Sequence, residues 1–249
     1  MRKIGIAISK GGTAKTTSAA NVAHGLARRG HKVALIDLDT QGQVKGFFGV
    51  EQRGTLAALV KGVPLADCLL EVRDNLHLMT GGPELAELEE WISTRTMKRE
   101  MVLSEFLQPL EDMKFDFVIL DTAPGWNALN VNLLFYVEEL LCPVKLEAMS
   151  MDGLKEFIGH LGQVQQYRAD LKMDYVVPTF LDRRENQCGE VLEILQNHFK
   201  SSVTMPIPKN VRLGESFGQG QTIYEYAPDC PGAYAYNDLT DLVESYVRK

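Results

Sequence analysis

The chain has 249 residues and a formal net charge of −7, and 45% of its residues are hydrophobic. This composition is typical of a folded globular protein and argues against disorder. A protein that coats nucleic acid through its overall charge would be basic, so any contact with DNA here needs a local basic patch. The length fits one α/β domain, and no linker-like segment divides it. We therefore expect a single domain over residues 1–249.

The cysteines and the N-terminal segment bear on the compartment. The four cysteines stand too far apart in the sequence for a metal knuckle or a C-x-x-C redox pair. We therefore expect reduced thiols in a cytoplasmic protein. The first apolar run, Ile4–Ile8, is too short for a signal peptide or a membrane span.

Short apolar runs rich in β-branched residues alternate with helix-like segments along the chain. Several runs are apolar throughout, which is typical of strands in a sheet covered on both faces. The alternation predicts an α/β fold with a doubly wound, mainly parallel sheet flanked by helices. The runs expected as strands are Ile4–Ile8, Lys32–Leu38, Asn75–Met79, Phe115–Leu120, Glu139–Val144, Tyr175–Phe180 and Val203–Met205.

The first expected helix, Thr16–Arg29, carries its apolar residues on one stripe, and Gly30 is expected to end it. Before it lies the segment Ser-Lys-Gly-Gly-Thr-Ala-Lys-Thr-Thr, residues 9–17. A tight loop between a strand and a helix directs backbone N–H groups and the positive end of the helix toward one anion. The segment therefore predicts a phosphate-binding loop.

The residues of this loop suit a nucleotide. Glycines allow the backbone to approach an anion, Lys15 would neutralise β- and γ-phosphate oxygens, and the Thr16 hydroxyl would ligate Mg²⁺. The residues expected to contact the nucleotide here are Lys10, Gly11, Gly12, Thr13, Ala14, Lys15, Thr16 and Thr17. The match to G-x-x-x-x-G-K-[ST] is imperfect, because Ser9 and Ala14 replace glycines. An ordinary Gly-Gly turn before a lysine-bearing helix is the alternative.

Carboxylates follow two further expected strands. Asp121 ends the run that begins at Phe115, at the edge where open α/β sheets bind ligands, and it would hold Mg²⁺ through water. Asp37 and Asp39 end the second expected strand. Asp39 is the candidate to orient or partly deprotonate the attacking water. Asp37 is either a further carboxylate of the site or a brace for the loop.

Together these motifs resemble the ParA/MinD family of deviant Walker ATPases. The blocks that carry the resemblance are the loop with its extra lysine, Lys10, and residues 35–42, 115–124, 179–182 and 207–213. The last block, with Glu215-Ser216 and residues 232–236, looks closest to the ParA/Soj branch. The resemblance covers nearly the whole chain.

The resemblance implies ATP and Mg²⁺ as cofactors, hydrolysis of ATP, and a homodimer that forms with ATP. Lys10 matches the signature lysine, which reaches the partner's ATP and lowers the repulsion between two facing anionic sites. Lys10, Lys15 and Asp39 are thus the expected catalytic residues. Pro208 and Asn210 match positions that contact adenine.

The same branch implies binding to DNA without sequence preference. Arg184 and Arg212 carry over by position, and Arg183 and Lys209 flank them. Contacts of this kind to phosphates are salt-sensitive. A solvated charged loop is the alternative. The resemblance further implies nucleoid association in the ATP state and a ParB-like or other small adaptor that stimulates hydrolysis. The cargo would be a plasmid, a chromosome origin or a protein organelle.

Three residues depart from the family pattern. Ala14 replaces a common glycine and is expected to slow turnover slightly without stopping phosphate binding. Thr40 stands where the branch usually has proline, and Lys145 stands where a neutral residue is usual. Nothing in the sequence explains Lys145.

Two rival functions remain. A MinD-like, membrane-recruited regulator would need a basic amphipathic tail. The last expected helix, about Tyr234–Lys249, carries three acidic residues, and only Arg248 and Lys249 are basic. We therefore expect no stable membrane binding. A dethiobiotin-synthetase-like metabolic enzyme would need a pocket for a second substrate and would leave Lys10 without a role.

One further motif is set aside. Gly214–Gly218 satisfies the nucleophile-elbow pattern G-x-S-x-G, but it lacks the preceding buried strand and a later histidine. We expect this segment to be a mobile loop near the nucleotide.

Overall fold

The computed structural model describes residues 1–247. Its strands are β1 (Arg2–Ile6), β2 (Val33–Asp37), β3 (Leu70–Arg73), β4 (Leu76–Met79), β5 (Phe117–Asp121), β6 (Glu139–Lys145) and β7 (Met173–Thr179). They form one seven-stranded sheet in the order β3-β4-β2-β5-β1-β6-β7. Every pairing between these strands is parallel except that of β3 with β4. The predicted α/β fold with a mainly parallel sheet is confirmed.

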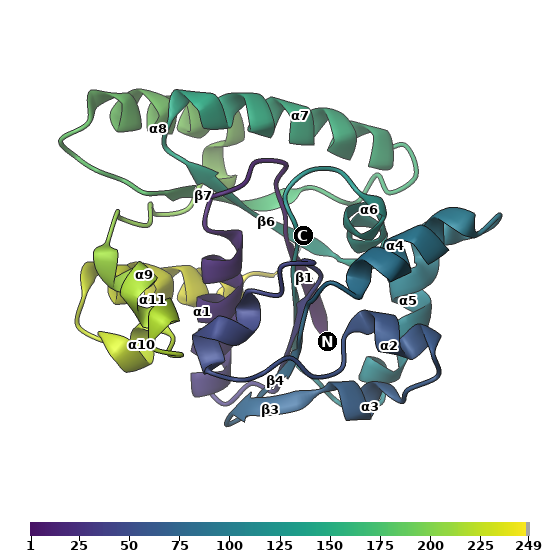
Figure 1. Ribbon diagram of the computed structural model, residues 1–249. Helices are drawn as coiled ribbons and strands as arrows, with labels where there is room; N and C mark the ends of the chain where they lie inside the picture. Colours follow the sequence, from purple (N-terminus) through teal and green to yellow (C-terminus); the bar gives the residue numbers. More distant parts are fainter. Residues whose placement is uncertain (248–249) are drawn as a thin grey trace.

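Helices cover both faces of this sheet (Figure 1). The α-helices are α1 (Lys15–Arg28), α2 (Leu56–Val60), α3 (Leu65–Cys68), α4 (Leu85–Thr94), α5 (Val102–Phe106), α6 (Ala128–Tyr136), α7 (Ala148–Val164), α8 (Asn186–Phe199), α9 (Val211–Gly218), α10 (Ile223–Tyr226) and α11 (Pro231–Ser245). Short 3₁₀ helices are η1 (Val44–Phe48), η2 (Arg99–Met101), η3 (Gln108–Glu111) and η4 (Lys200–Ser202). Helices α9 to α11 gather beside α1, whereas α4 to α6 lie on the other side of the molecule.

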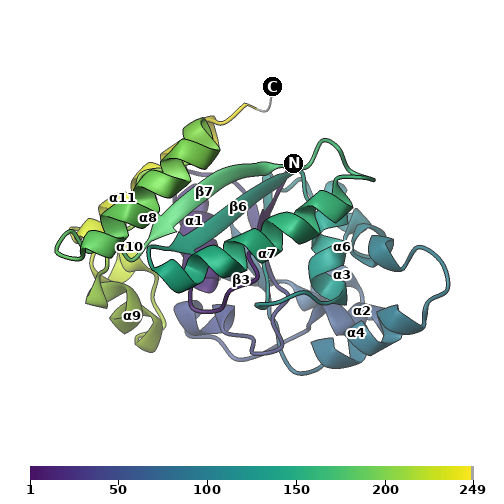
Figure 2. The ribbon, with the colours of Figure 1, turned by 90° about the horizontal axis from the view of Figure 1, so that it is seen from above.

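The alternating side chains of each strand divide between two hydrophobic cores. In β2, Val33 and Leu35 join a core with α1, α10 and α11, while Ala34 and Ile36 join a core with α2 and α4 to α8. Successive side chains of a strand point to opposite faces, so a strand buried on both sides is apolar throughout. Seen from above, β6 and β7 lie between α1 and α7 (Figure 2).

Helix α1 forms as its sequence predicts. Its apolar stripe is buried against the sheet, with Val22 and Leu26 fully inaccessible. Gly30 follows in the left-handed region, with φ 91°, where a glycine ends a helix at little steric cost. Because α1 is fixed at this end and packed along one face, its first turn is held at the carboxyl edge of the sheet.

One expected strand is wrong and one strand was missed. In Val203–Met205 only Val203 pairs, in an isolated bridge with Val176. The segment then runs beside β7, but Pro206 lacks an N–H donor and interrupts the ladder. The missed strand β3 has only four residues, none of them fully buried, and it pairs antiparallel with β4 through a turn that has Asn75 at φ 63°.

The segment Gly214–Gly218 is also different from expectation, because it forms the end of helix α9 and not a loop. Asn210 explains the start of this helix. Its side-chain oxygen accepts a hydrogen bond from the backbone N–H of Arg212 at 2.9 Å, which satisfies one of the free donors of the first turn.

Ala14 adopts a conformation that usually needs glycine. It precedes α1 in the left-handed region, with φ 73° and ψ 31°. A residue with a Cβ loses roughly 1–2 kcal/mol in this region. The strain lies in the phosphate loop itself, next to Lys15.

We predict that Ala14→Gly raises the free energy of unfolding by about 1 kcal/mol, because the backbone strain is removed at a modest cost in chain entropy. Urea unfolding followed by circular dichroism measures the change. The control is Ala86→Gly in α4, an exposed alanine in an ordinary helical conformation, which should lose about 1 kcal/mol. Equal losses in both variants would contradict the assignment of strain to Ala14.

Candidate nucleotide site

The segment between β1 and α1 forms an anion-binding loop. Gly12 and Ala14 both have left-handed backbones, with φ 70° and 73°. Helix α1 begins at Lys15, and its first N–H groups receive no side-chain cap from Ala14. Free N–H groups at a helix start, together with the helix dipole, favour a bound anion.

Lys15 is held inside this loop. Its side chain is largely buried, and Nζ donates a hydrogen bond to the carbonyl oxygen of Lys10 at 3.0 Å. Burial lowers the pKa of the Lys15 ammonium, and the charges of Asp121 and Asp39 oppose this effect. The ammonium therefore stands at the loop with acidic neighbours but with few contacts to water.

Asp121 is the most deeply buried acid of the site. Its side chain is inaccessible to solvent, and within residues 1–247 neither carboxylate oxygen accepts a hydrogen bond of good geometry, although the Thr16 hydroxyl lies nearby. Burial raises the pKa of Asp121 well above its usual value, and the neighbouring Asp37 adds to this, while the nearby Thr16 hydroxyl and Lys15 ammonium oppose it. The ionised form of a carboxylate buried with so little hydrogen bonding is stabilised by a nearby cation.

These groups fit Mg²⁺ bound together with phosphates. Oxygen ligands such as the Asp121 carboxylate and the Thr16 hydroxyl are those that Mg²⁺ prefers, with water and phosphate oxygens completing the shell. In the part of the chain that the structure describes, no cluster of three or more His, Cys, Asp or Glu side chains could hold a metal ion alone. A cation here would therefore depend on the bound phosphates.

Asp37 braces the loop that carries Asp39. Its Oδ1 accepts a hydrogen bond from the backbone N–H of Asp39 at 2.9 Å, and its Oδ2 accepts one from that of Val44 at 3.1 Å. Burial raises the pKa of Asp37 to about 7, and these amide donors oppose the rise. Of the two readings left open for Asp37, the bracing role fits these contacts.

Gly81, which follows β4, packs directly against this loop. A methyl group at Gly81 would overlap the carbonyl oxygen of Asp39 and the carboxylate of Asp37. The backbone N–H of Gly81 also lowers the pKa of Asp37 by hydrogen bonding. Sequence reasoning missed Gly81, since only the fold brings the end of β4 beside the end of β2.

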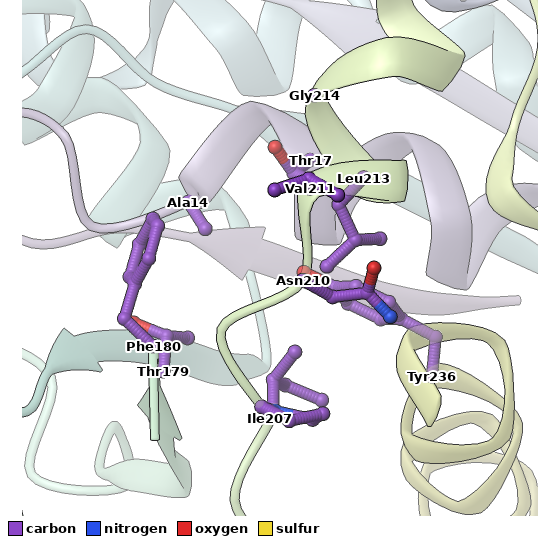
Figure 3. A pocket seen from close by; sticks show the side chains of 11 residues that line it. Ala14, Thr17, Thr179, Phe180, Ile207, Asn210, Val211, Leu213, Gly214 and Tyr236 are labelled. Carbon is purple, nitrogen blue, oxygen red and sulfur yellow. The ribbon is translucent and has the colours of Figure 1, made fainter. Parts of the chain in front are cut away.

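Two adjoining cavities meet at the phosphate loop. A polar cavity of about 390 Å³ is lined by residues of the loop and by Asp39, Gln41, Gln43, Thr122, Pro124 and Phe180. A mainly apolar cavity of about 260 Å³ is lined by Thr179, Ile207, Pro208, Asn210, Val211, Leu213, Gly214 and Tyr236 (Figure 3). Ala14, Thr17 and Phe180 line both. A polar compartment joined to an apolar one suits a triphosphate joined to a base.

The structure brings most of the predicted residues to these cavities. Those that line them are Gly11, Gly12, Ala14, Lys15, Thr16, Thr17, Asp39, Pro208 and Asn210. Asp121 lies buried opposite Asp37 in the neighbouring strand. Thr13 is buried, and its carbonyl oxygen accepts a hydrogen bond from the Thr179 hydroxyl at 3.1 Å. Phe180 and Tyr236 were missed as lining residues.

Lys10 lies beside α7. A Cβ added at Gly153 would come within 2.8 Å of the Lys10 Cβ, so the loop and the helix are in close contact. Lys145 is the main cause of a lowered pKa of Glu147, and the charge of Lys10 contributes to it. Lys10 is only partly buried. Lys10 does not line either of the two cavities, in contrast to Lys15.

Arg184 and Arg212 lie on neighbouring segments, which a bridge between Leu181 and Pro208 joins. Both arginines are exposed, and each pairs with an acid: Arg184 with Asp182 at 2.7 Å and Arg212 with Glu215 at 3.0 Å. The Arg184 guanidinium holds the pKa of Asp182 well below its usual range.

The flanking basic residues differ in their surroundings. Lys209 pairs with Glu185 at 3.3 Å, and Arg183 is exposed beside Arg184. Four basic side chains thus gather with three acidic ones, so the local excess of positive charge is small.

The tail of the chain was expected to argue against a membrane anchor. Arg248 and Lys249 lie outside the described residues. Among residues 1–247, no helix combines the length and the apolar character needed to cross a bilayer.

Comparisons of sequence place this chain among known proteins. Residues 1–173 match the family model described as AAA domain. The chain is 34% identical over 252 residues to the chromosome-partitioning ATPase Soj of Thermus thermophilus, covering 100% of this chain and 98% of that protein. It is 32% identical to the chromosome partitioning protein ParA of Myxococcus xanthus, covering 90% of this chain and 82% of that protein.

Solved structures share the fold. The cobyrinic acid a,c-diamide synthase of Mycobacterium smegmatis, with bound ADP and magnesium, has a TM-score of 0.83 and 27% identity, covering 100% of this chain and 97% of that one. McdA of Cyanothece has a TM-score of 0.85 and 21% identity, covering 98% and 100%. The matched family model and the full-length similarity to Soj, together with the phosphate loop, show that the chain belongs to the AAA domain family and, within it, to the ParA/Soj branch of P-loop ATPases.

Proposed function

We propose that the protein is a Mg²⁺-dependent ATPase whose ATP-bound homodimer binds DNA without sequence preference and so positions or segregates a cargo. The observation that carries the proposal is the pair of adjoining cavities that meet at the phosphate loop above the buried Asp121. The similarity to Soj and ParA supports the partition role. A ParB-like or other small adaptor would stimulate hydrolysis, and the protein would be cytoplasmic and nucleoid-associated with ATP.

The chain's own groups suffice to place a nucleotide. Pro208 and Asn210 lie in the apolar cavity, where the base would bind. The loop N–H groups and Lys15 would contact the phosphates, with the positive end of α1 behind them. When bound, Mg²⁺ would neutralise phosphate charge, and Thr16 and Asp121 are the residues that would hold it.

Asp39 is the residue that we propose acts on a water molecule. It lines the polar cavity, and its Oδ1 accepts a hydrogen bond from the backbone N–H of Gln41 at 2.8 Å. The brace from Asp37 fixes the backbone that carries it. In the proposed mechanism, Asp39 orients the attacking water at the terminal phosphate and accepts part of its proton.

Lys10 is the proposed contact in trans. It stands at the margin of the cavities beside α7, with its side chain only partly buried. Two facing triphosphates repel one another, and a cation supplied by the partner lowers that repulsion. The name of the Mycobacterium smegmatis neighbour is that of a synthase, which corresponds to the rival hypothesis of a metabolic P-loop enzyme. Such an enzyme would have no use for a Lys10 that contacts the nucleotide of a second subunit.

We predict that Lys10→Ala abolishes dimerisation with Mg²⁺ and a non-hydrolysable ATP analogue but leaves ADP binding by the monomer within about twofold, since Lys15 still contacts the phosphates. Light scattering coupled to gel filtration measures the mass, and calorimetry measures ADP binding. Lys155→Ala, an exposed lysine of α7, is the control. A Lys10→Ala protein that dimerised and turned over ATP normally would favour the metabolic rival.

We predict that Asp39→Ala binds ATP and dimerises but hydrolyses ATP at least ~100-fold more slowly, because the water loses its general base. Lys15→Ala, in contrast, should lose nucleotide binding altogether. Phosphate release and nucleotide titration separate the two effects. Normal hydrolysis by Asp39→Ala would show that another group orients the water.

On the proposed DNA surface, removing an arginine and removing the charge of the acid paired with it should change DNA binding in opposite directions. Arg184→Ala and Arg212→Ala should weaken binding to random-sequence duplex DNA, while Glu215→Gln should strengthen it and steepen its dependence on salt. Gel retardation with ATP and with ADP at several salt concentrations measures both. Lys61→Ala, at the residue that directly follows α2 and pairs with Glu87, is the control. Equal retardation with ATP and ADP would refute the nucleotide switch.

A further inference from the structure

Phe180 directly follows β7 in a backbone conformation that bulky residues avoid. Its φ is 59°, in the left-handed region. The residues on either side hold it there. The carbonyl oxygen of Thr179 accepts a hydrogen bond from the N–H of Leu146 at 3.0 Å, and the N–H of Leu181 donates to the carbonyl oxygen of Ile207 at 3.1 Å. When hydrogen bonds on both sides hold a strained backbone in place beside a cavity, the side chain at that position is expected to have a function.

The position of the Phe180 ring suggests that use. Phe180 belongs to the walls of both the apolar and the polar cavity, as does Ala14. Figure 3 shows the ring reaching toward Ala14, on the opposite side of the apolar cavity from Tyr236. The residue is 37% exposed although its side chain is large and apolar. A group that spans the two cavities would pass directly beside this ring.

Lys145, which the sequence leaves without explanation, holds the ring from outside. It ends β6, and its Nζ lies 5.6 Å from the centroid of the Phe180 ring. The ammonium also pairs with the Glu147 carboxylate at 2.5 Å. An ammonium over an aromatic face is attracted by the ring quadrupole, and the carboxylate keeps the ammonium in place. The ring is thus fixed by its own backbone and by a cation anchored at the start of α7.

We propose that Phe180 contacts the sugar of the bound nucleotide, between base and phosphates, and that Lys145 is a positioning residue that orients the Phe180 ring. The inference rests on the proposed occupation of the two cavities by a nucleotide, and it adds a contact to that site. The ring covers the apolar face of the sugar and separates the base compartment from the phosphate compartment. A neutral residue at position 145 would leave the ring free to rotate away from the cavity.

Calorimetry with ADP and Mg²⁺ on the full chain tests the contact. Phe180→Ala should weaken ADP binding on the order of tenfold, since a buried aromatic contact is lost. Phe180→Gly should bind equally weakly, although it relieves the backbone. If Phe180→Gly bound ADP as tightly as the unaltered protein, the ring would have no role and the proposal would fall. Circular dichroism checks that each variant is folded.

The positioning role has its own test. Lys145→Met, which keeps the length but removes the charge, should weaken ADP binding about threefold, and Lys145→Arg should restore it because a guanidinium also binds an aromatic face. Lys155→Met, at an exposed position of α7, should bind as the unaltered protein. Emission of a fluorophore attached to the ribose should change in Lys145→Met and Phe180→Ala only. An unaltered affinity and emission in Lys145→Met would overturn its positioning role.

Lys15→Ala separates this inference from the proposed function. If Lys15→Ala loses ADP binding while both Phe180 variants keep it, the nucleotide site stands and the sugar contact is refuted. If Lys15→Ala itself binds ADP normally, the phosphate loop does not hold the nucleotide, and the proposed function fails with the inference.

Discussion

The structure depends on an imbalance of buried charge at the carboxyl edge of the sheet. Asp37 and Asp121 are opposite one another in adjacent strands and both are inaccessible, while Lys15 is the cation buried with them. Burial raises the pKa of both carboxyl groups; Lys15 partly opposes the rise at Asp121, whereas backbone N–H donors oppose it at Asp37. Carboxylates buried without enough cations cost free energy, so the site favours ligands that bring positive charge.

The two carboxylates differ in the hydrogen-bond partners that compensate for their burial. Asp37 is satisfied by backbone N–H donors and serves the structure of the neighbouring loop. Asp121 has no such backbone donors within the described residues, and it is the carboxylate that we propose holds a metal ion. In the parallel sheet, several buried strands end at the same edge. The phosphate loop, Asp37 and Asp121 therefore lie within one small region. The chemistry therefore follows from where the strands end.

Much of this arrangement could be predicted from the sequence, because it rests on local patterns. The apolar runs predicted six of the sheet's strands, and the loop and Asp121 stand in motifs with a strand before them. Strand β3 was missed because it is short, includes the charged residues Glu71 and Arg73, and forms only by pairing with β4. The strand expected at Val203–Met205 was wrong because periodicity does not register the missing donor of Pro206.

The residues that sequence reasoning missed depend on contacts between distant segments. Gly81 matters only because β4 ends beside β2, and the partner of Lys145 is a ring 35 residues away in the chain. The acids that pair with Arg184 and Arg212 are near in sequence, but their effect on the surface charge needs the pairing geometry. The sequence pattern identifies the charged side chains, whereas the fold determines which of them form ion pairs.

The close packing of Gly81 against Asp39 has a mechanical consequence. Because even a methyl group at Gly81 would overlap the carbonyl oxygen of Asp39, a displacement of the Asp39 backbone toward Gly81 would have to move the segment 80–84 as well. Helix α4 begins at Leu85, directly after that segment, and its side chains Leu88 and Ile92 are embedded in the core. A small shift of the loop that carries Asp39 would thereby reach the start of α4.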